Sequence, residues 1–161
     1  MSTRCLLYLI AIVSSSCSFF LTGPTELKSD NFNYSFEKPG WDSIDPDTSD
    51  VAYLNSNTGS IILANSLCKK YQSSTLDYLS SNLLSGIENI KVVKKSNRQI
   101  SDRDALEVIA TGMLDGVSVK LKSLILQKNR CTYDFILIMP KQIISNDLAA
   151  FESFIKSVRL P

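Results

Sequence analysis

The segment ALEVIATGMLDGVSVKLKSLIL, residues 105–126, has two runs of aliphatic and β-branched residues separated by Asp115-Gly116. An Asp-Gly pair readily takes the positive φ angles of a type I′ turn, so the segment predicts a two-residue hairpin. Its strands are 105–114 and 117–126. A third strand at 131–139 continues them into an antiparallel meander.

The two turns of this meander predict which residues share a face of the sheet. If Lys128-Asn129 also forms a two-residue turn, Ser123 lies opposite Asp134 on neighbouring strands. The apolar residues of this face are Leu106, Val108, Ala110, Leu114, Val117, Val119, Leu121, Ile125, Ile136 and Ile138. We expect this face to be the core, covered by helices.

Asp134 is a carboxylate on this predicted apolar face, where it must be paired, hydrogen-bonded or neutral. One interpretation is a structural polar bridge to Ser123, which is favoured because most buried polar groups are satisfied within the fold. The other is a ligand pocket floored by Asp134 and Ser123 and lined by Leu121 and Ile136.

The flanking segments predict the remaining elements of an α+β domain. Residues 51–55 and 60–66 flank the turn sequence SNTG and predict a second hairpin. Residues 90–95 predict a further strand. The apolar spacing in 73–86 and 145–158 predicts two helices. The expected fold is an antiparallel sheet of about six strands packed by two main helices.

The order of these elements, together with FEKPGW at 36–41, resembles the PsbP/Mog1/DcrB-like group. LDGV at 114–117 and CTYDF at 131–135 are similar to features of small bacterial envelope lipoproteins. The resemblance extends over about residues 34–158 and implies an α/β sandwich, in which an antiparallel sheet packs between helices. It also implies an accessory or binding role, and no catalytic residues carry over from it.

The first 16 residues have the features of a secretory signal peptide. Arg4 precedes nine apolar residues, 5–13, which are too few to span a bilayer because that needs about 20. Three serines then precede Cys17. This arrangement resembles the lipobox of bacterial lipoproteins, whose cysteine carries the lipid, although Val13 lies one place further out than the usual aliphatic residue. The alternative is cleavage at the serines, which would release a soluble secreted protein.

The cysteine count favours the lipoprotein. Cleavage before Cys17 leaves three cysteines, and an odd cysteine is a liability in an oxidising compartment. Lipidation of Cys17 removes its free thiol, and Cys68 and Cys131 are left to form a disulfide. Residues 17–33 then form a flexible tether between the lipid and a single domain at 34–161.

Several chemistries are excluded or disfavoured by the residues present. The chain has no histidine, which excludes a Ser-His-Asp triad and histidine metal ligands. Residues 42–50 begin like a calcium-binding EF-hand loop, but Asp50 stands where glycine is needed. The acids Asp102, Asp104 and Glu107 lie close together in sequence, and we expect a solvated loop. No enzyme activity, metal site or cofactor is therefore predicted.

Charge also limits the partners. Residues 17–161 carry 16 cations and 16 anions, which gives no general electrostatic reason to bind nucleic acid. The one basic cluster is Lys91, Lys94, Lys95 and Arg98. It can meet anionic lipid headgroups, or it can protect an exposed strand edge against aggregation, which we favour.

These observations predict a non-catalytic lipoprotein of the bacterial cell envelope with a protein partner there. Lipid on Cys17 would anchor it to the membrane. Ser18 favours the outer membrane by the sorting habit of enteric bacteria, with the domain facing the periplasm or the surface. The alternative is a periplasmic carrier of a small apolar ligand or lipid, and an enzyme using carboxylates alone is the third hypothesis.

Overall fold

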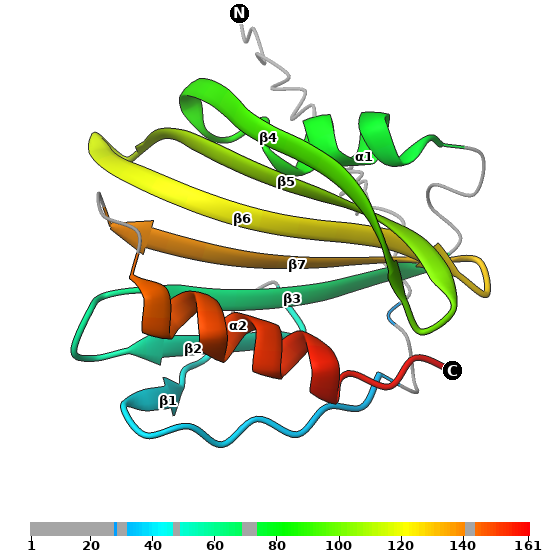
Figure 1. Cartoon of the computed structure of the whole chain (residues 1–161), viewed down its shortest axis with the longest axis horizontal. Coiled ribbons are helices and arrows are strands. Elements are labelled where there is room, and N and C mark those ends of the chain that lie inside the picture. Colours follow the sequence, from blue (N-terminus) through cyan, green and yellow to red (C-terminus); the bar gives the residue numbers. More distant parts are fainter. Residues whose placement is uncertain (1–27, 29–31, 47–48, 69–73, 141–143) are drawn as a thin grey trace, which may run out of the picture.

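A computed structural model of the chain describes residues 28, 32–46, 49–68, 74–140 and 144–161. The expected signal peptide and Cys17 lie outside these residues. Within them, seven strands form one antiparallel sheet in the order β1-β2-β3-β7-β6-β5-β4 (Figure 1). The strands are β1 (Trp41–Ser43), β2 (Val51–Asn55), β3 (Ile61–Cys68), β4 (Glu88–Ile100), β5 (Arg103–Leu114), β6 (Val117–Lys128) and β7 (Cys131–Pro140). The helices are α1 (Leu76–Leu83) and α2 (Ser145–Ser157).

The sequence predicted about six strands, and the strand that it missed is β1. This strand has three residues, WDS, and pairs with the end of β2 at the edge of the sheet. A segment this short shows no alternation of apolar and polar residues, so nothing in the sequence distinguishes it from a loop. The two predicted hairpins, β2–β3 and β5–β6, are confirmed.

Both faces of the sheet are buried, each under one helix, with α2 in front of the sheet and α1 behind it in Figure 1. The predicted apolar face is confirmed except for Val117, which is exposed beside the β5–β6 turn, and it packs against Leu79 and Leu84 of the α1 region. Of the helices expected to cover this face, only α1 does so, and the sheet lies between the two helices as the resemblance implies. Helix α2 packs Phe151 and Phe154 on the opposite face. That face contains Leu124, Leu126, Tyr133, Phe135 and Leu137. Strands β6 and β7 are apolar on both sides, as strands buried on both faces are.

The turn between β6 and β7 differs from the prediction by one residue. It is formed by Asn129-Arg130, at φ angles of 51° and 66°, and Lys128 pairs with Cys131. Asn takes positive φ at lower cost than most residues, which favours this turn over Lys128-Asn129. The cross-strand pairing shifts by two residues as a result, and an even shift keeps every side chain on its predicted face.

The register of β3 against β7 places Cys68 directly opposite Cys131, and the two form a disulfide. This confirms the predicted pairing. The bond joins the two strands that are adjacent at the middle of the sheet but 63 residues apart in sequence.

The FEKPGW segment leads into the β1 edge beside α2. Phe36 is buried, with its ring centroid 5.5 Å from that of Phe154 and 5.9 Å from that of Trp41. Upstream, Phe32 packs against the same core, and the backbone of Asn33 pairs with Arg159 near the end of the chain. The described fold therefore includes the last two residues of the segment that was expected to be a tether.

Candidate functional site

A cavity of about 260 Å³ lies on the α1 side of the sheet, between that helix and strands β3, β6 and β7. Its apolar lining consists of Leu63, Leu67, Leu79, Leu83, Ile125 and Ile136. Its polar lining consists of Ser49, Asn65, Asn82, Thr132 and Asp134. An apolar hollow with a few convergent polar groups is the usual form of a small-molecule site.

Asp134 is the one carboxylate in this lining. Burial raises the pKa of Asp134 to about 7, the positive charge of Lys28 opposes that rise, and the negative charge of Asp50 adds to it. Lys28 itself interacts with two other groups. Its Nζ lies 3.4 Å from Oδ1 of Asp50, and it donates a hydrogen bond to Oδ1 of Asn65. A carboxyl group with a pKa this far above 3.8 changes its charge within the physiological pH range.

The four residues predicted for a ligand pocket are only partly brought together. Asp134 and Ile136 line the cavity, whereas Leu121 and Ser123 are buried on the same face but outside the lining. The predicted Ser123–Asp134 cross-strand pair was wrong, because Ser123 lies opposite Ile136. Sequence reasoning also missed the contribution of β3, whose Asn65 lies opposite Asp134.

The second surface of interest is the exposed edge of the sheet formed by β4, which we call the β4 edge (residues 88–95). The prediction that the basic cluster lies on an edge strand is confirmed. Its lysines surround the exposed side chains of Ile90, Val92 and Val93, and Val93 is 65 % exposed. A register shift between Val92 and Lys94 leaves Val93 without a partner residue on β5. Lys95 pairs with Asp77 of α1.

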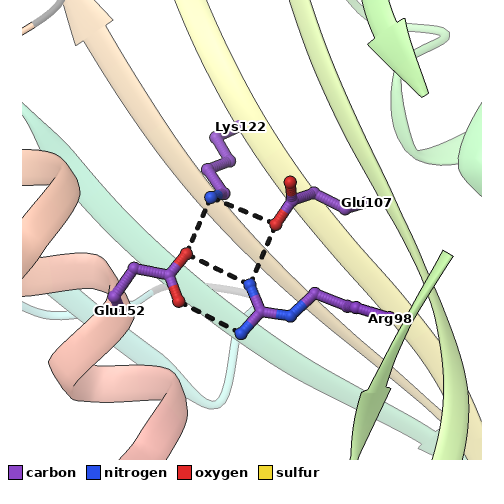
Figure 2. A network of polar contacts seen from close by, with 4 residues as sticks. All are labelled: Arg98, Glu107, Lys122 and Glu152. Atoms are coloured by element: carbon purple, nitrogen blue, oxygen red, sulfur yellow. Dashed lines mark hydrogen bonds and ion pairs between the residues drawn. The ribbon is translucent and has the colours of Figure 1, made fainter. Parts of the chain in front are cut away.

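On the other face, four charged residues form a closed network between the sheet and α2 (Figure 2). Arg98 of β4 donates to Glu107 of β5 at 2.9 Å and to both carboxylate oxygens of Glu152 of α2 at 3.1 Å. Lys122 of β6 lies 3.1 Å from Glu107 and 2.7 Å from Glu152. Burial raises the pKa of Glu152, but the hydrogen bonds and charges of Arg98 and Lys122 outweigh it, so the pKa is lowered overall.

This network explains the acidic cluster differently from the prediction. Asp102 and Asp104 are exposed, as expected, but Glu107 is buried and points into the network. Two cations balance two anions, and every charged group has an opposite partner. The arrangement is that of a structural cross-link between β4, β5, β6 and α2, rather than a pair of carboxylates in a cleft.

The part of the chain that the structure describes holds no group of three or more Cys, Asp or Glu side chains arranged to bind a metal ion. Neither of the helices in this part has the length and apolar character needed to cross a bilayer.

Comparison by sequence gives no match, either to a model of a known protein family or to a curated protein. Comparison by structure does. LpqN, involved in cell envelope biogenesis of Mycobacterium tuberculosis, matches with a TM-score of 0.57 and 8% identity, over 85% of this chain and 86% of LpqN. Cyanobacterial PsbP (CyanoP) from Synechocystis sp. PCC 6803 matches with a TM-score of 0.56 and 8% identity, over 86% of this chain and 96% of CyanoP. PA94 from Pseudomonas aeruginosa, a protein of unknown function, matches with a TM-score of 0.52 and 12% identity, over 84% and 85%.

The fold is PsbP-like. This confirms the resemblance drawn from the FEKPGW segment and the order of the elements. Identities of 8 to 12% show a shared fold alone, since one fold serves many functions.

Proposed function

We propose that this chain is a non-catalytic accessory protein of the bacterial cell envelope, anchored by lipid on Cys17, that binds an envelope protein partner through the β4 edge. The observation that carries the proposal is the exposure of Ile90, Val92 and Val93 among lysines on that edge. Lysines alone would protect the strand from association. Adjacent exposed apolar side chains instead favour contact with another protein.

The chemistry of the edge defines the partner. An edge strand has backbone N–H and C=O groups that can pair with a further strand. Lys91 and Lys94 are exposed beside the valines. The partner therefore presents an extended segment, or a surface, that combines acidic and apolar side chains. Acidic groups would pair with the lysines, and apolar groups would cover Val92 and Val93.

An envelope location is supported by three features. A disulfide such as Cys68–Cys131 persists in oxidising compartments outside the cytosol. The first 16 residues have the pattern of a secretory signal peptide. LpqN, which has a similar fold, is an envelope biogenesis protein. We infer outer-membrane attachment from Ser18, which follows the lipidated cysteine.

The partner is tested by photocrosslinking in the host cell. A photoreactive amino acid replaces Val93 in one variant and Val117 in the other. Val117 is a matched control because it is 57 % exposed but lies at the tip of the β5–β6 hairpin. The proposal requires a discrete crosslinked envelope protein from position 93 and much less from position 117. Equal crosslinking from the two positions, or no crosslinking from position 93, would contradict the proposal.

The anchor is tested by the intact mass of the protein from host membranes, compared with a Cys17→Ser variant. A chain that begins at Cys17 with added acyl mass is expected, and the variant should lose both the acyl mass and the membrane association. An unacylated wild-type chain would make this a free secreted domain.

A second candidate function is the carriage of a small ligand, and the cavity beneath α1 favours it. The cavity is lined by six apolar side chains, four neutral polar ones and one carboxylate. A hollow of this kind can hold a small molecule that has an apolar body and one polar end.

A further inference from the structure

We infer that the cavity beneath α1 binds a small organic monocation, an amine with a compact apolar body, whose ammonium group pairs with Asp134. This rests on the second candidate function, the carriage of a small ligand, and specifies the class of that ligand. Three properties of the cavity carry it: its charge, its hydrogen bonding and its size.

Charge comes first. Among the residues that the structure describes, Asp134 and Asp50 are the two carboxylates of this region, and Lys28 is the cation that acts on them. When both carboxylates are ionised, the three groups have a net charge of −1, so one further positive charge would balance them. The neighbouring polar side chains from β3 and α1, Asn65 and Asn82, are neutral. An anion would be repelled, and a neutral apolar molecule would leave a desolvated carboxylate uncompensated.

Hydrogen bonding leads to the same class of ligand. The residues that the structure describes form no hydrogen bond to the carboxylate of Asp134, whose side chain is half-buried, so its oxygens are open to a donor that enters the cavity. Lys28 is engaged with Asp50 and Asn65. An ammonium group supplies both the charge and up to three N–H donors, and Thr132 and Asn82 offer oxygen acceptors for donors that Asp134 does not use.

The size and lining set the body of the ligand. A volume of about 260 Å³ is below the roughly 300 to 1,000 Å³ of pockets that hold drug-sized molecules, so the ligand is small. Leu79 and Leu83 from α1 and Ile136 from β7 contribute apolar walls. A ring of six carbon atoms bearing an aminomethyl group matches this size and this separation of apolar and charged ends.

The test compares three probes of the same size by isothermal titration calorimetry on the purified full chain. They are cyclohexylmethylamine, which is cationic, cyclohexylmethanol, which is neutral, and cyclohexanecarboxylate, which is anionic. The variant Asp134→Asn removes the charge and keeps the side-chain shape. Asp102→Asn is the matched control, because Asp102 is exposed and its φ of 61° suits Asn.

The amine is expected to bind at least tenfold more tightly than the alcohol at pH 8. This preference should be lost in Asp134→Asn and unchanged in Asp102→Asn. Because Asp134 has a pKa of about 7, its ionised fraction falls about tenfold from pH 8 to pH 6, and the affinity for the amine should fall with it. The affinity for the alcohol should not. A Leu83→Phe variant, which narrows the cavity, should weaken both probes.

The possible outcomes distinguish the inference of an amine ligand from the second candidate function, the carriage of a small ligand. If the alcohol binds as well as the amine, or if Asp134→Asn keeps the preference for the amine, the inference is wrong but ligand carriage survives. If none of the probes binds at millimolar concentration, both are wrong. Binding that Leu83→Phe leaves unchanged would place the ligand elsewhere and would also overturn the inference.

Discussion

Replacing Asp134 by Asn should stabilise the unliganded protein, and by an amount that depends on pH. The pKa of Asp134 rises from 3.8 to about 7 on folding, which is about three pH units. Each unit corresponds to 1.36 kcal/mol, so keeping this carboxylate ionised in the folded state costs up to about 4 kcal/mol. Asn has nearly the same shape and no charge, and it avoids this cost.

The sign of this dependence of stability on pH follows from proton binding. Between pH 3.8 and about 7, the folded state holds a proton on Asp134 that the unfolded state has released. The free energy of unfolding therefore decreases as the pH rises through this interval, and this contribution is constant above it. At pH 5 the wild-type side chain is a neutral acid in the folded state, so wild type and Asp134→Asn should differ little. At pH 8 the variant should be more stable by up to about 4 kcal/mol.

Urea denaturation at pH 5 and pH 8, analysed by linear extrapolation, measures both differences. Asp102→Asn serves again as the control and should leave the free energy of unfolding unchanged at both pH values. If Asp134→Asn has the same effect at pH 5 and pH 8, or is less stable than wild type at pH 8, then Asp134 is not the desolvated carboxylate described above.

Three further predictions concern the stability of the fold, each measured by urea denaturation. Gly112→Ala should cost about 1 to 3 kcal/mol, because a Cβ at this position would lie 2.9 Å from a backbone carbonyl oxygen; Gly86→Ala, with nothing within 4 Å, should be tolerated. Reducing the Cys68–Cys131 disulfide, which spans 63 residues, should cost about 4 kcal/mol, and an unchanged denaturation midpoint would contradict this. Glu152→Gln should cost about 1 to 2 kcal/mol at pH 7, and this loss should vanish as the pH falls below the lowered pKa of Glu152.

The sequence predicted much of the sheet because its signals are local. The Asp115-Gly116 turn was correct, and the β5–β6 hairpin follows from it. The turn after Lys128 was placed one residue early, yet Asp134 still lies on its predicted face, because the pairing shifted by two residues. An odd shift would have moved Asp134 to the face covered by α2.

The sequence could not predict the features that depend on distant parts of the chain. Glu107 lies next to exposed acids in sequence, and only the approach of β4 and α2 shows that it belongs to a network with Arg98 and Glu152. The cavity likewise depends on where α1 crosses the sheet and on Asn65 of β3, and the apolar pattern of the strands gives neither. The exposure of Val93 depends on a β-bulge, which leaves no mark in the alternation of residues.

Two groups of partly buried charge differ in a way that bears on function. In the α2-side network each carboxylate contacts two cations, so folding alone accounts for those residues. Among the described residues Asp134 has no comparable partner, and its ionised form opposes folding by up to about 4 kcal/mol. A neutral residue at this position of β7 would serve the fold better. Asp134 costs stability and lines a cavity, and a positively charged ligand in that cavity would turn its carboxylate into a favourable contact.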